Sequence, residues 1–157
     1  MEGKIKALDD NAAVRILTTV AEYHLDEGGP DIQLSGDLKG ELSKEFNEGA
    51  SGVAVSDGEM AREALVLLAQ DTEMREKITR LIEKPAEHGD RYKFALDPVT
   101  VGVLTTAVVM VLKTQFKIGL DKKGRWSFEV KSKAVDMEVL KGFVNKLLSW
   151  VPSGPFR

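Results

Sequence analysis

The sequence DPVTVGVLTTAVVMVLKTQFKIGLDKKGRWSFEV, residues 97–130, decides the fold because a helical pattern changes to a strand pattern within it. Asp97-Pro98 is a helix start signal, since the carboxylate can cap free amides and the fixed proline φ suits the first helical position. The stretch Val99–Leu112 carries no charge. It predicts a helix from Pro98 to about Lys113 that is buried on nearly every side and lies at the centre of the fold.

Two alternating runs follow this helix. The apolar positions are Phe116, Ile118 and Leu120 in the first run and Trp126, Phe128 and Val130 in the second. Their period of two predicts strands. Asp121–Gly124 joins the runs, and Gly124 can adopt the positive φ that a tight turn demands. The pattern predicts a β-hairpin with one aromatic and aliphatic face and one charged face.

The C-terminal region predicts an amphipathic helix that begins near Asp136. Its apolar residues recur at spacings of three and four: Val139, Leu140, Phe143, Val144, Leu147, Leu148 and Val151. This spacing places them on one side of a helix. We expect the helix to pack on the apolar face of the hairpin, and Pro152–Arg157 to form a loose tail.

The N-terminal region is predicted to be helical as well. An amphipathic helix begins near Asp10 and runs to about Leu25, where glycine and proline follow. Further along, Asp37–Phe46 predicts a short helix, whereas Ile32 and Leu34 fit a short strand.

A stronger helix start stands at Ser56. The residues from Ser56 to Glu59, SDGE, fit a capping box, in which the serine oxygen accepts from the amide three residues on. A helix should follow directly. At Asp71 the pattern allows either a break or a continuation through Ile82, and Pro85 ends the helix because proline cannot donate an amide hydrogen bond.

Together these elements predict a single α+β domain, residues 1–157. It is mostly helical, with one C-terminal β-hairpin packed between the buried central helix and the C-terminal amphipathic helix. The net charge of −3 conceals an asymmetry: residues 1–90 hold 10 basic and 20 acidic residues, a net −10, whereas residues 91–157 hold 12 and 5, a net +7. Such halves either complement each other, within the fold or a homo-oligomer, or steer a partner.

The sequence lacks the residue patterns that catalysis and cofactor binding need. It has no cysteine, and its two histidines, His24 and His88, stand apart without a metal-binding or nucleophile motif. It contains no phosphate-binding loop, and the acidic residues between Asp26 and Asp37 do not have the spacing of a calcium loop. We predict no enzyme activity, no cofactor and no metal site. The first residues carry no secretory signal, which predicts a cytoplasmic protein.

The hairpin contributes a candidate basic interaction surface. Its residues are Lys117, Lys122, Lys123, Arg125, Lys131 and Lys133. Cations beside Trp126 and Phe128 are typical of nucleic-acid sites, but strand alternation places the two aromatics on the face opposite Arg125 and Lys131. A stacking platform and a phosphate groove would therefore not coincide. We expect a protein partner and disfavour nucleic acid.

A polar loop at Glu83–Tyr92 joins the acidic and basic halves. It contains the candidate processing residues Glu83, Lys84 and Arg91. We expect this loop to be the most protease-sensitive internal segment of the chain.

The order of these elements resembles small bacterial proteins that are encoded beside caspase-like CHAT proteases and other conflict-system effectors. The resemblance covers about residues 58–150 and is carried by DPVT at 97–100, LKTQ at 112–115, GRWSF at 124–128, and VLK to KLLS between 139 and 149. It implies an adaptor, regulator or protease substrate in a bacterial immunity or cell-death pathway, with a caspase-like protease or effector as partner. No binding residues transfer through it.

The alternative function is a membrane-perturbing effector that proteolysis releases. In this hypothesis the Val99–Leu112 helix inserts into a bilayer after the basic half has been drawn to anionic lipid. The helix has 14 residues, and a bilayer-spanning helix needs about 20. The length favours the adaptor.

Overall fold

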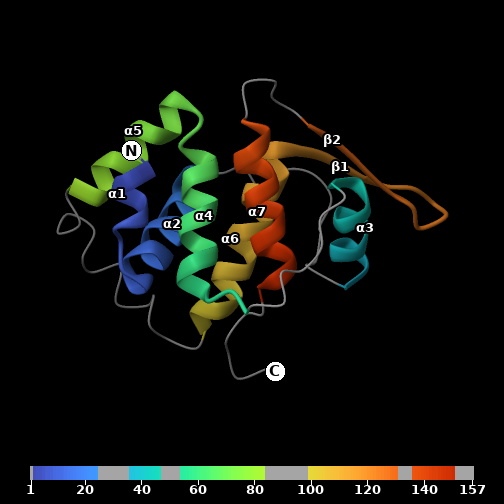
Figure 1. Ribbon diagram of the computed structural model, residues 1–157, viewed down its shortest axis with the longest axis horizontal. Coiled ribbons are helices and arrows are strands. Elements are labelled where there is room, and N and C mark those ends of the chain that lie inside the picture. Colours follow the sequence, from blue (N-terminus) through green and yellow to red (C-terminus); the bar gives the residue numbers. More distant parts are fainter. Residues whose placement is uncertain (1, 25–35, 47–53, 84–98, 131–135, 151–157) are drawn as a thin grey trace.

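The computed structural model describes residues 2–24, 36–46, 54–83, 99–130 and 136–150. In chain order its elements are α1 (Glu2–Lys6), α2 (Asp10–His24), α3 (Gly36–Phe46), α4 (Asp57–Leu68), α5 (Thr72–Glu83), α6 (Val99–Gln115), β1 (Phe116–Leu120), β2 (Trp126–Val130) and α7 (Met137–Ser149). The described chain is thus α+β, mostly helical with one antiparallel hairpin, as predicted. The hairpin and α3 lie together at one end of the helical assembly (Figure 1).

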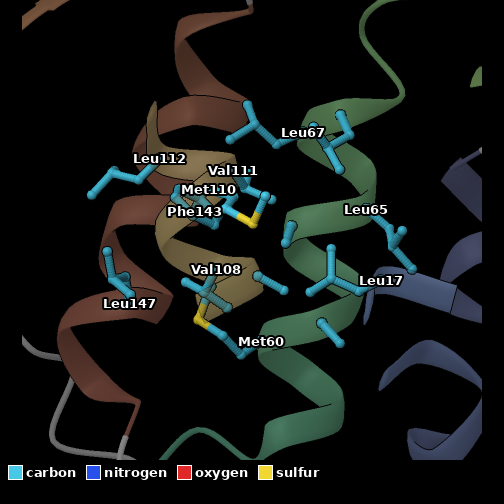
Figure 2. Close-up of a cluster of buried hydrophobic side chains, with 14 of the residues drawn as sticks. Leu17, Met60, Leu65, Leu67, Val108, Met110, Val111, Leu112, Phe143 and Leu147 are labelled. Carbon is cyan, nitrogen blue, oxygen red and sulfur yellow. The ribbon is translucent and has the colours of Figure 1, made fainter. Parts of the chain in front are cut away.

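Helix α4 occupies the middle of this assembly, in contact with α1, α2, α5, α6 and α7. The Ser56 hydroxyl accepts a hydrogen bond from the Glu59 N–H at 3.1 Å, which confirms the predicted N-cap. Beyond the cap, Met60, Ala61 and the whole run Ala64–Leu68 are buried. Figure 2 shows side chains of α4, α6 and α7 meeting in one core, with Leu17 of α2 beside them.

Helix α6 is buried as its uncharged sequence predicts. Leu104 and all six residues of Ala107–Leu112 are buried, while Thr106 is exposed. Six consecutive residues span more than one helical turn, so other parts of the fold must cover this segment on all sides. The helix contacts α2, α4 and β1. It therefore shares the centre of the fold with α4, whereas the sequence pointed to α6 alone.

The structure contains the predicted hairpin. β1 pairs antiparallel with β2, so that Ile118 lies opposite Phe128 and Leu120 opposite Trp126. Residues at these alternating positions share one face of a sheet, which makes that face apolar. Gly124 has a φ of 79°, the left-handed conformation that the turn needs.

The predicted packing of the C-terminal helix on the hairpin needs correction. Helix α7 begins beside Asp136, as predicted, and the Asp136 carboxylate accepts from the Glu138 N–H at 2.9 Å, but the helix packs chiefly against α4 and α3. α3 contacts β2, and its Phe46 ring meets Phe116 edge-on at 5.3 Å between centroids. Leu38 and Leu42 are fully buried, so α3 also has an apolar side to cover.

The remaining helices settle one open alternative and add one element. The chain breaks between α4 and α5, and Asp71 begins the second helix by accepting from the Met74 N–H at 3.0 Å. The short helix α1 was not predicted, although Ile5 is fully buried. The strand expected around Ile32 and the tail at 152–157 lie outside the described residues.

Candidate functional site

The tip of the hairpin is built around the carboxylate of Asp121. Its Oδ1 accepts from the backbone N–H groups of Lys123 at 2.9 Å and Arg125 at 2.8 Å, and its Oδ2 accepts from the Arg125 Nε at 3.0 Å. These hydrogen bonds hold the pKa of Asp121 below its ordinary value, because each donor favours the charged carboxylate. The Arg125 N–H has the largest effect, and the Arg125 side chain and the Lys123 N–H add to it. The turn is therefore fixed by its own acidic residue.

The four described residues of the predicted basic surface are Lys117, Lys122, Lys123 and Arg125, and all four are exposed. The four side chains do not contribute equally to the net positive charge of this surface. Arg125 is paired with Asp121, and Lys117 lies directly opposite Glu129 in the strand register. In the described part of the chain no acidic side chain pairs with Lys122 or Lys123. Of the four, Lys122 and Lys123 are thus the two without an acidic partner in the described part of the chain. Lys131 and Lys133 lie outside the described residues.

The apolar face of the hairpin is covered unevenly. Phe116 and Ile118 of β1 are only 1% and 8% exposed, whereas Trp126 and Phe128 of β2 are only partly buried. The Trp126 and Phe128 rings stack, with centroids 6.4 Å apart and an interplanar angle of 13°. β2 therefore presents a stacked, partly solvent-exposed aromatic pair close to the cationic tip.

The predicted processing loop is described at one residue. Glu83 is the last residue of α5, not part of a loop, and its carboxylate pairs with Lys4 of α1 at 3.4 Å. Lys84 and Arg91 lie outside the described residues, so the loop stays a prediction.

The sequence did not indicate a polar junction around Trp150. The Trp150 side chain is fully buried, and its indole N–H donates to the Asp57 carboxylate at 2.8 Å. The Lys39 ammonium donates to the Trp150 carbonyl at 3.1 Å, and partial burial lowers the pKa of Lys39. Val55 forms a bridge with Trp150, in which its N–H donates to the Ser149 carbonyl at 3.3 Å. This junction ties α3, α4 and α7 together. A tryptophan directly after an amphipathic helix was its one sequence signal.

His24 is the last residue of α2, and His88 lies outside the described residues. Within the described ranges, no three His, Cys, Asp or Glu side chains gather as metal ligands would. In the same ranges, no helix combines the length and the apolarity that crossing a membrane requires.

Comparison with known proteins adds nothing to this geometry. No family model matches the chain, and neither a curated protein nor a solved structure matches it. The resemblance to proteins encoded beside CHAT proteases therefore stays a prediction from the sequence.

Proposed function

We propose that this chain is a non-enzymatic protein–protein interaction module, acting as an adaptor, regulator or protease substrate in a bacterial immunity or cell-death pathway. One observation carries the proposal: strand β2 presents a partly exposed, stacked aromatic pair beside Lys122 and Lys123, which have no acidic partner among the described residues. The pathway comes from the sequence resemblance described above.

Two physical arguments support a protein partner at the hairpin. Tryptophan and other aromatic residues dominate the energetics of protein interfaces, because large rigid rings bury much apolar area at little entropic cost. Cationic groups beside such an anchor accelerate encounter with an acidic partner and help to set specificity. Trp126 and Lys122–Lys123 supply these two elements on one turn and strand.

The charge distribution also favours an external partner over internal compensation. An ion pair between Lys146 of α7 and Glu59 of α4, 3.8 Å apart, does link the basic and acidic halves. The tip lysines, however, have no acidic partner among the described residues. Their charge remains available to an acidic surface.

The test is complex formation with the proteins encoded next to this chain. Each neighbour would be co-expressed with the full chain, and complexes would be measured by size-exclusion chromatography and titration. We expect one neighbour to bind. The double variant Lys122→Glu/Lys123→Glu should weaken binding at least tenfold.

The matched control is Arg80→Glu/Lys141→Glu, which makes the same charge change at two exposed residues of α5 and α7. It should bind like the unmodified chain. The proposal fails if no neighbour binds, or if the control weakens binding as much as the tip variant. Turnover of a nucleotide, ester or peptide that is lost on replacing His24 or His88 would overturn the non-enzymatic part.

A further inference from the structure

We infer that the outer edge of β2 binds an extended, acidic peptide segment of the partner protein as a third strand. The inference rests on the proposed function and specifies where and how that partner binds. Three features of the hairpin lead to it: the direction of its backbone groups, the uneven cover of its apolar face, and the position of its free charge.

The first feature is the hydrogen-bond alternation of the hairpin. The Asp121 N–H donates to the Arg125 carbonyl at 3.0 Å, which makes these residues a hydrogen-bonded pair at the turn. In an antiparallel ladder, hydrogen-bonded and non-hydrogen-bonded pairs alternate. The backbone groups of Trp126 and Phe128 therefore point away from β1, along the outer edge of β2. No other strand in the described ranges pairs with that edge.

The second feature is the contrast between the two strands. Phe116 and Ile118 on β1 are already buried, and α6 runs directly into β1, so a peptide would find little apolar surface there. Trp126 and Phe128 on β2 are partly exposed. A third strand beside β2 would place alternate side chains on the same face as these rings. It would satisfy the edge amides and cover the aromatic pair together.

The third feature decides the chemistry of the peptide. Lys122 and Lys123 stand at the tip, next to the start of β2. Acidic residues at the end of the peptide that lies near the tip would meet both ammonium groups. A second copy paired through the same edge offers Trp126–Val130 followed in sequence by Lys131 and Lys133, and this stretch holds one acidic residue, Glu129. Any of its cations placed opposite the tip lysines would be destabilising. The occupant is therefore an acidic segment of another protein.

The experiment pans the full chain against a displayed library of random nine-residue peptides. We expect enrichment of sequences that alternate apolar with other residues and carry Asp or Glu at one end. The best peptide would then be synthesised with N-methyl groups at single positions. Methylation should abolish binding at every second residue, those that donate to β2, and should be tolerated in between.

Protein variants locate the site. Lys122→Glu/Lys123→Glu should lower the affinity for the synthetic peptide at least tenfold, and the remaining affinity should depend less on salt concentration. Arg80→Glu/Lys141→Glu is again the matched control, because it makes the same charge change at exposed residues outside the hairpin, and it should change affinity less than twofold. Trp126→Ala should also lower the affinity for the peptide, and circular dichroism would check that this variant is folded.

The outcomes separate this inference from the proposed function. Enriched peptides without acidic residues, or N-methyl tolerance without a period of two, would overturn the inference while a neighbour complex still upheld the interaction module. A dimer of the chain that dissociates on Trp126→Ala would assign the edge to a second copy and overturn it too. Absence of both peptide binding and a neighbour complex would defeat both proposals.

Discussion

Helix α4 is enclosed by α1, α2, α5, α6 and α7, whereas the β1–β2 hairpin contacts α6 and α3 and ends in an exposed turn. Nearly all of α4's apolar side chains are buried, so its residues are constrained by several elements at once. The hairpin is held by its own ladder and by the Asp121 carboxylate. Changes in α4 should therefore affect the whole fold, and changes in the hairpin tip should stay local.

The largest effect is expected from Leu65→Asp in α4. Leu65 is fully buried, and an unpaired charge there costs several kcal/mol against a total stability of about 5–15 kcal/mol. The variant should be insoluble or molten, as should Val108→Asp in α6. Lys123→Asp at the exposed tip is the control and should keep the native circular dichroism spectrum and Tm. A soluble Leu65→Asp variant with native Tm would show that α4 is no more sensitive to substitution than the hairpin tip.

The Trp150 junction should give the next largest effect. Trp150→Phe removes the indole N–H that bonds the Asp57 carboxylate at 2.8 Å and leaves that acceptor short of a donor. Hydrogen bonds to charged groups contribute about 1.5–3 kcal/mol, so we expect a loss of that order in denaturant unfolding. A double-mutant cycle with Asp57→Asn isolates the bond. A coupling energy near zero would show that Trp150 acts by packing alone.

Gly58→Ala in α4 should destabilise, and Gly40→Ala in α3 should stabilise. A Cβ at Gly58 would collide with the Asp10 side chain, which pairs with Arg62 at 2.7 Å, whereas a Cβ at Gly40 meets nothing within 4 Å. Overpacking costs about 1–3 kcal/mol. Alanine in an open helical position gains about 0.5–1 kcal/mol over glycine. Equal shifts of Tm in both variants would contradict the close approach of α2 to α4.

Acid should loosen the hairpin tip before the helices. Because the folded pKa of Asp121 is depressed, its stabilising effect is present above the unfolded pKa and is lost as pH falls through the folded value, below about pH 4. NMR amide shifts of Lys123 and Arg125 should report this transition, and Asp121→Asn should abolish it. If the α4 amides shifted with the same midpoint, the tip would not be a local unit.

The smallest expected effect concerns membranes, where we expect none. Leu104 and Ala107–Leu112 of α6 are buried in the core, so neither the intact chain nor the chain cut within residues 83–92 should release dye from anionic vesicles. The cut chain is the informative sample, because the alternative function requires release of the +7 half. Leakage that appears only after cleavage would favour the membrane-perturbing effector over the interaction module.

Local signals predicted much of the fold and the position of the candidate site. The Ser56 cap was confirmed, the C-terminal helix begins beside Asp136 as predicted, and the turn at Gly124 has the expected left-handed φ. These features depend on residues within four positions of one another. The exposure of Lys117 was also predictable, because strand alternation separates charged from apolar side chains, and Lys122 and Lys123 belong to the predicted turn. Only the structure showed that Arg125 pairs with Asp121, whereas Lys122 and Lys123 have no acidic partner among the described residues.

The sequence by itself determined the type and approximate bounds of most elements, the burial of α6 and the two faces of the hairpin. Only the tertiary structure decided which surfaces meet. It placed α3, not α7, against β2, put α4 in the middle, and joined Asp57 to Trp150 across 93 positions. The physical reason is that the hydrophobic effect is non-directional, so a sequence shows which faces are apolar but not which two faces pack together. Complementary shape and chain connectivity decide that pairing.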